Sequence, residues 1–76
     1  MNAREHLDWC VERAMDYANT GDMPQAWASF GSDVGKHEDT AHIATHELFA
    51  MAMFSGLYDR PEAFRDFISG WAVGAS

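Results

Sequence analysis

The sequence predicts an all-α fold, a small four-helix domain built as two tandem helical hairpins. The first observation is a repeated phrase: residues 22–27, Asp-Met-Pro-Gln-Ala-Trp, recur 37 positions later as residues 59–64, Asp-Arg-Pro-Glu-Ala-Phe. The second is that each copy has the features of a helix start, with an Asp that can cap, a Pro in the first turn and a Gln or Glu that can reach back. The third is an aromatic residue three positions after each copy ends, Phe30 or Phe67, which gives each helix an aromatic pair on one face.

The first hairpin is expected at about residues 3–35. Its first helix covers about 3–19, where Asn2 caps and Glu5 closes a capping box. Gly21 suits the left-handed turn that follows. Its second helix covers about 23–34. An apolar stripe at helical spacing faces inward from the first helix, and it consists of Leu7, Cys10, Val11, Ala14, Tyr17 and Ala18.

Residues 36–45 are polar and are predicted to link the hairpins, with a short turn of helix beginning at Asp39 or Thr40. Thr45 is then expected to cap a helix over about 46–57. This helix is apolar nearly all round, which is typical of a helix at the centre of a core or in an interface.

The second hairpin spans about 46–71, and its last helix is expected over about 60–69. Gly70 is predicted to end that helix, and the tail from Ala72 is predicted to fray. The whole chain, residues 1–76, forms a single domain at this length.

The net charge is −7, from twelve acidic and five basic residues. This balance argues against direct binding of nucleic acid or of anionic membranes through phosphate contacts. It fits a basic protein partner, competition for a nucleic-acid site, or simply solubility. The chain has one cysteine, no recognisable signal peptide and no apolar run long enough to span a bilayer, so a cytoplasmic location is expected.

Neither a cofactor nor a metal is predicted. His42 and His46 are four residues apart, but His37-Glu38 precedes His42 with the wrong spacing for a His-Glu-x-x-His zinc site. His42 and His46 are better explained as cap, linker or surface residues near a helix start, and whether His37, His42 and His46 bind metal stays open. Cys10 lies on the apolar stripe and is expected to be a buried small hydrophobe. No catalytic motif is present, and the protein is not expected to be an enzyme.

A partner-binding face is predicted on the first helix. If Leu7 and the rest of the stripe point inward, Trp9 falls on the opposite side beside Arg13, and an exposed Trp with Arg is typical of interface hot spots. The alternative is that Trp9 packs against the tail or the 36–45 linker. An acidic edge at steps of four residues completes the predicted face, formed by Asp8, Glu12 and Asp16.

Two families resemble parts of the chain. Tyr17, Gly21-Asp22, Ala26 and Phe30 are similar to the turn of a tetratricopeptide hairpin, although the offset of 37 exceeds the usual repeat of about 34 and Tyr58-Asp59 replaces Gly-Asp in the second copy. This likeness implies architecture only.

The second resemblance covers about the first 45 residues. The stretches 2–10, 32–37 and 40–43 resemble small proteins encoded by phages of actinobacteria. That family has no assigned activity, so the resemblance implies only an intracellular phage-encoded accessory protein, in the cytoplasm of the infected host.

We therefore expect a non-catalytic, acidic protein–protein interaction module that acts on a host protein. Two alternatives stay open. The first is an acidic nucleic-acid mimic that inhibits a host or defence enzyme, and the second is a structural homodimer that buries the apolar helix between subunits.

Overall fold

The computed structural model describes residues 2–74, and within this range it contains helices and no strand. The predicted all-α class is confirmed. The five helices are α1 (Ala3–Ala18), α2 (Met23–Val34), α3 (Ala41–Ala44), α4 (Glu47–Ser55) and α5 (Pro61–Gly74). The short α3 is the turn of helix expected in the linker.

The predicted bounds of α1 and α2 are confirmed because local capping specifies them. The Asn2 side chain accepts a hydrogen bond of 2.8 Å from the Glu5 amide, and the Asp22 side chain accepts one of 3.2 Å from the Gln25 amide. Between the helices, Gly21 adopts φ +87°, a conformation that residues with a Cβ rarely adopt.

Tertiary contacts position the linker. Thr40 is fully buried, and its hydroxyl donates a 2.6 Å hydrogen bond to the Val34 carbonyl at the end of α2. This bond folds the 36–45 segment back over the C-terminal end of α2, so α3 packs beside α2 and places Ile43 in the core.

The predicted start of α4 is wrong by one residue. The cap is His46, whose ring nitrogen accepts a 3.1 Å hydrogen bond from the Leu48 amide, and Thr45 instead hydrogen-bonds the His42 carbonyl. The helix ends at Ser55, and Gly56 caps it with φ +76°.

The prediction that Gly70 ends the last helix is also wrong. The helix α5 continues through Gly70 to Gly74. The backbone is therefore still helical at Ala72, where fraying was expected to begin. The physical reason is the contact that Trp71 makes beyond Gly70, with its ring centroid 5.1 Å from that of His46. Residues 75–76 of the predicted tail lie outside the described residues.

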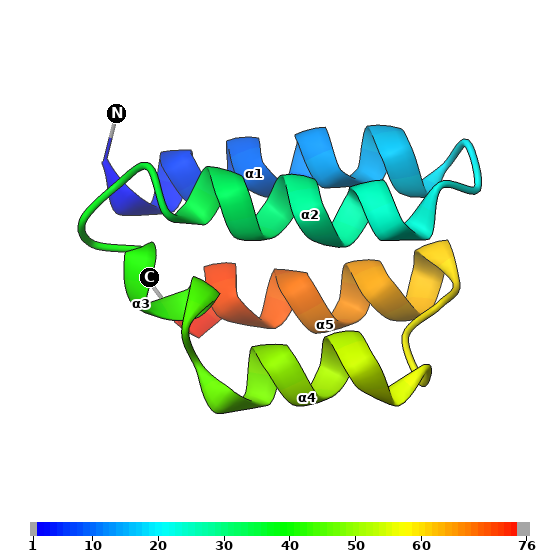
Figure 1. The fold of residues 1–76 in the computed structure, drawn as a ribbon. Coiled ribbons are helices and arrows are strands. Elements are labelled where there is room, and N and C mark those ends of the chain that lie inside the picture. Colours follow the sequence, from blue (N-terminus) through cyan, green and yellow to red (C-terminus); the bar gives the residue numbers. More distant parts are fainter. Residues whose placement is uncertain (1, 75–76) are drawn as a thin grey trace.

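The helices are arranged with α1 and α2 side by side and antiparallel, α5 below them and α4 at the lower edge (Figure 1). The two copies of the repeat begin at the same end of the molecule, and Trp27 and Phe64 meet with ring centroids 4.8 Å apart. The pairing of α4 with α5 as a second hairpin stays a prediction. The core is formed by buried apolar residues from all five helices, namely Leu7, Cys10, Ala14, Ala18, Ala26, Trp27, Phe30, Val34, Ile43, Phe49, Ala52, Phe64 and Ile68.

Within the described part of the chain, no helix is both long and apolar enough to cross a bilayer.

Candidate protein-binding surfaces

The predicted partner-binding face on α1 is only partly exposed. The acidic edge formed by Asp8, Glu12 and Asp16 is exposed along the helix. Trp9, in contrast, is half-buried and packs against the core. The expectation that Trp9 stands on the opposite side from the core is therefore wrong, because the end of α2 and the start of the linker cover its flank of α1.

A buried carboxylate anchors this region. Asp33 of α2 is 1% exposed, and two cations neutralise it, with Arg13 Nε at 2.7 Å and Lys36 Nζ at 3.1 Å from its two oxygens. The Ser29 hydroxyl adds a longer contact of 3.4 Å. Because a buried charge is costly unless it is paired and hydrogen-bonded, Asp33 ties α1 to the end of α2.

Trp9 forms the outer wall of this cluster. The Arg13 guanidinium lies 4.9 Å and the Lys36 ammonium 5.8 Å from its ring centroid, both within the range of cation–π attraction. The two cations therefore contact Asp33 and Trp9 at once. This arrangement holds Trp9 in a defined position. Because Lys36 is the first residue of the 36–45 linker, the contact agrees in part with the alternative that Trp9 packs against the linker.

His6 completes the cluster from the first turns of α1. Its Nε2 lies 2.7 Å from the backbone carbonyl of Asp33, and because a carbonyl only accepts, Nε2 is the protonated nitrogen that donates. The His6 ring also lies near those of Trp9 and His37, with centroids 5.5 and 5.2 Å away. The interactions of His6 are those of a buried structural histidine, because its donating nitrogen binds the backbone carbonyl of Asp33.

The other histidines have local roles. His37 accepts a 3.1 Å hydrogen bond from the Asp39 amide, and His46 caps α4. Among residues 2–74, no three His, Cys, Asp or Glu side chains converge as a metal site would require. The cap role predicted for His46 is confirmed.

Cys10 is completely buried between α1 and its neighbours. Burial raises the pKa of its thiol from 9.0 to about 12, with the carboxylate of Asp33 adding to the effect. A thiol that stays protonated and inaccessible is a poor nucleophile, and the prediction of a buried small hydrophobe is confirmed.

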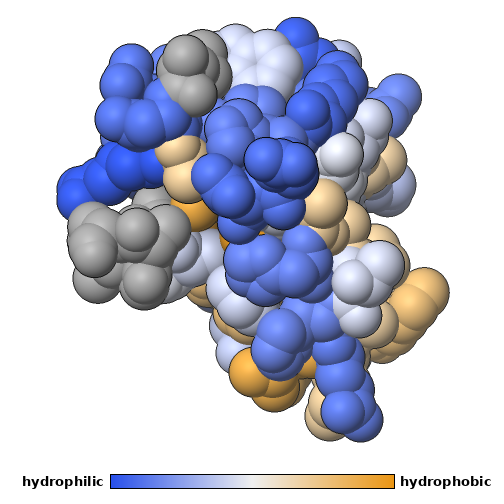
Figure 2. All heavy atoms as spheres, turned by 90° about the vertical axis from the view of Figure 1, so that its left-hand side faces the viewer, coloured by the Kyte–Doolittle hydropathy of each residue, from blue (hydrophilic) through white to orange (hydrophobic). Residues whose placement is uncertain are grey.

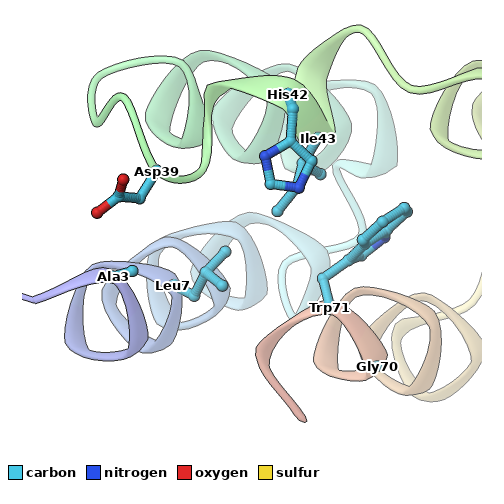
Figure 3. A pocket seen from close by; sticks show the side chains of 7 residues that line it. All are labelled: Ala3, Leu7, Asp39, His42, Ile43, Gly70 and Trp71. Atoms are coloured by element: carbon cyan, nitrogen blue, oxygen red, sulfur yellow. The ribbon is translucent and has the colours of Figure 1, made fainter. Parts of the chain in front are cut away.

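A hollow of about 470 Å³ opens where the start of α1, α3 and the end of α5 meet. In Figure 3 the His42 ring projects from α3 into this space and Trp71 faces it from α5, while Asp39 stands to one side. The remaining lining is Ala3, Leu7, Ile43 and Gly70. The walls are thus largely apolar, and the two titratable side chains come from one segment and do not converge on a common point.

Four of the five large apolar residues that are exposed in the described part of the chain lie on α4 or just after it. Phe49 and Ala52 point into the core, whereas four large apolar residues are more than half exposed: Leu48 at 57%, Met51 at 60%, Phe54 at 82% and Leu57 at 75%. We call these four residues the α4 ridge. In Figure 2 apolar spheres are more numerous in the lower part of the molecule, where Figure 1 places α4, although polar spheres lie among them, and polar spheres predominate in the upper part.

Two hollows flank the α4 ridge. One, of about 530 Å³, lies toward the start of α2 and is lined by Met23, Pro24, Trp27, Met53, Phe54 and Asp59. The other, of about 210 Å³, lies toward α5 and is lined by Leu48, Met51, Ala52, Ser55, Leu57, Tyr58 and Phe67. Both are open and mostly apolar, and the charged group among their lining residues is Asp59.

Comparisons with models of protein families, with curated proteins and with solved structures found no match to this chain.

Sequence reasoning had missed the residues at the centre of the Trp9 cluster. Asp33 lies three residues after Phe30 and seven after Ala26, so its position in the buried stripe of α2 was readable from helical spacing. Lys36, three residues later, was readable from the same spacing, but Arg13 was not, because it is 20 residues away in the chain and meets Asp33 only when α1 and α2 pack. The predicted pairing of Arg13 with Trp9 is present, but Arg13 is bound to Asp33 as well.

Proposed function

We propose that this protein is a non-catalytic protein–protein interaction module and that the α4 ridge is its main contact surface. The observation that carries the proposal is the exposure of three large apolar side chains on α4 and of Leu57 just after it. A soluble monomer rarely leaves an apolar patch larger than roughly 300–600 Å² uncovered without a function. The exposed Leu, Met and Phe side chains can insert into a partner protein, and the two hollows beside them can receive apolar side chains of that partner.

The predicted face on α1 remains a second part of this proposal. Asp8, Glu12 and Asp16 are exposed there, and the paired cations hold Trp9 in place. This face is polar and charged, so it fits the rim of an interface better than its centre. The resemblance to phage-encoded proteins of actinobacteria supports a host protein as the partner.

Site-specific photo-crosslinking tests the proposal and separates the two faces. The full chain is prepared with a photoreactive phenylalanine analogue at position 54, 12 or 25 and irradiated in an actinobacterial lysate. Phe54 represents the α4 ridge, Glu12 the acidic edge, and the exposed Gln25 of α2 a control surface. We expect one dominant crosslinked protein from position 54, a weaker yield of the same protein from position 12, and none from position 25. Equal yields from all three positions would contradict a defined contact surface.

The acidic edge favours one alternative, a nucleic-acid mimic that occupies a basic groove of a host or defence enzyme. Three exposed carboxylates at successive turns of α1 present a line of negative charge. This alternative predicts crosslinks from position 12 in preference to 54, and partner binding that weakens steeply with salt. Binding that is insensitive to salt would exclude it.

A further inference from the structure

We infer that the occupant of the α4 ridge is a basic amphipathic helix of the partner protein. The inference rests on the proposed function and adds the chemical class of the partner. It follows from the shape of the surface, the side chains that form it and the charges around it.

The shape suits a helix. The nine residues of α4 extend about 13 Å, which corresponds to two to three turns of a partner helix. Hollows of about 530 and 210 Å³ lie on either side of the ridge, so apolar residues at helical spacing on the partner have two sockets to fill. Recognition of this kind uses anchors at positions i, i+3 or i+4, and i+7 of the bound helix.

The side chains of this surface are adaptable. Met23 and Met53 line the larger hollow, and Met51 stands on the ridge and lines the smaller one. Unbranched, polarizable methionine side chains adjust to differently shaped anchors, which is why they recur on surfaces that bind amphipathic helices.

The charge at the border is mostly negative. Asp59 lines the larger hollow, and Asp22 directly precedes Met23, which lines the same hollow. Glu47 directly precedes Leu48 of the α4 ridge. All three carboxylates belong to exposed residues, and Arg60 directly follows Asp59 in the sequence. Lysines or arginines that flank an apolar stripe would therefore meet complementary charge.

The overall charge argues against a second copy of this chain as the occupant. Of the five basic residues, Arg13 and Lys36 are already bound by Asp33, which leaves three. Face-to-face association of two copies, each with a net charge of −7, would bring two acidic borders together. A basic helix gains from the same border.

The test uses synthetic peptides of 18 residues and the full-length protein. The first peptide consists of Leu and Lys, with Leu on one helical face. The second has the same composition in scrambled order, and the third keeps the Leu positions but replaces Lys with Glu. Binding is measured by calorimetry and by tryptophan fluorescence, to which Trp27 beside the larger hollow contributes.

We expect the Leu/Lys helix to bind at least about tenfold more tightly than either other peptide. Phe54→Ser should weaken its binding by about tenfold or more, whereas Tyr17→Ser, at an exposed aromatic residue of α1, should leave it unchanged. Asp59→Asn should weaken binding about threefold and the matched control Asp16→Asn by much less. Circular dichroism of each variant checks that the fold is retained.

Equal binding of the scrambled or the Leu/Glu peptide would overturn the inference. So would sedimentation of the wild-type protein as a micromolar dimer that Phe54→Ser converts to a monomer, because the occupant would then be a second copy. If no peptide binds but crosslinks to a protein persist from position 54, the proposed function stands and the basic helix is the wrong class of partner.

Discussion

The α1–α2 pair and α4 show how differently one chain can use apolar residues. Along α1 and α2 buried positions alternate with exposed ones, and the small residues Ala14, Ala18 and Ala26 let the two helices approach closely. In α4 nearly every residue is apolar, yet only Phe49 and Ala52 are buried. The more apolar helix is thus the less buried one. The difference teaches that apolar content alone does not identify the core, because burial depends on which neighbours cover a face.

The sharpest way to test this contrast is thiol accessibility, for which we expect the largest effect. Cys10 should react with a disulfide reagent at pH 8 at least about a hundredfold more slowly in the folded protein than in urea, because burial keeps it inaccessible and protonated. A Met51→Cys substitution in a Cys10→Ala background should react at the rate of a free thiol. A protected thiol at position 51 would show that the α4 ridge is covered.

The same thiol predicts a dependence of stability on alkaline pH. The pKa of Cys10 is about 12 in the folded protein and 9.0 as its ordinary value, so folding favours the protonated thiol. Its contribution to stability is complete below pH 9 and is lost as the pH rises toward 12. Urea unfolding followed between pH 8 and pH 11 should show a smaller decline for Cys10→Ala than for the wild type.

Replacing one phenylalanine by alanine in each region should lower the free energy of unfolding by amounts that differ by several kcal/mol. Phe30→Ala removes a fully buried ring and should lower the free energy of unfolding by about 3–5 kcal/mol. Phe54→Ala removes an exposed ring and should change it by no more than about 0.5 kcal/mol. Both values come from urea titrations of the purified variants. A large loss for Phe54→Ala would mean that α4 packs against more of the protein than the structure shows.

The Asp33 cluster should contribute less than the aromatic core. Asp33→Ala leaves Arg13 and Lys36 without their shared partner, but both cations remain about half exposed, so the expected loss is about 1–3 kcal/mol. The tryptophan fluorescence should change as well, since the two cations beside Trp9 are released. The exposed Asp16→Ala is the matched control and should leave both readouts nearly unchanged.

The smallest effect is expected at the contact between α2 and α4. A Cβ added at Gly31 would lie 3.5 Å from the Phe49 ring, which is an ordinary van der Waals distance. Gly31→Ala should therefore stabilise α2 by about 0.5–1 kcal/mol through helix propensity, and thermal unfolding should record a higher midpoint. A destabilised Gly31→Ala variant would mean that Phe49 sits closer to α2 than this distance.

Much of the local structure was readable from the sequence because its causes are local. Asn2 and Asp22 cap their helices through residues three positions away, and Gly21 makes the turn that its backbone freedom allows. The end of α5 was not readable in this way. A glycine after a helical stripe usually stops a helix, and here the distant contact of Trp71 with His46 outweighs that local tendency.

By itself, the sequence determined the helical class, the starts of α1 and α2 and the acidic charge, because spacing, capping and composition act within a few residues. Only the tertiary structure decided that Asp33 draws Arg13 and Lys36 beneath Trp9, and that α4 turns its Leu, Met and Phe side chains outward. Both outcomes depend on which helices pack together. A helix that is apolar on every side carries no pattern to say which face its neighbours will cover.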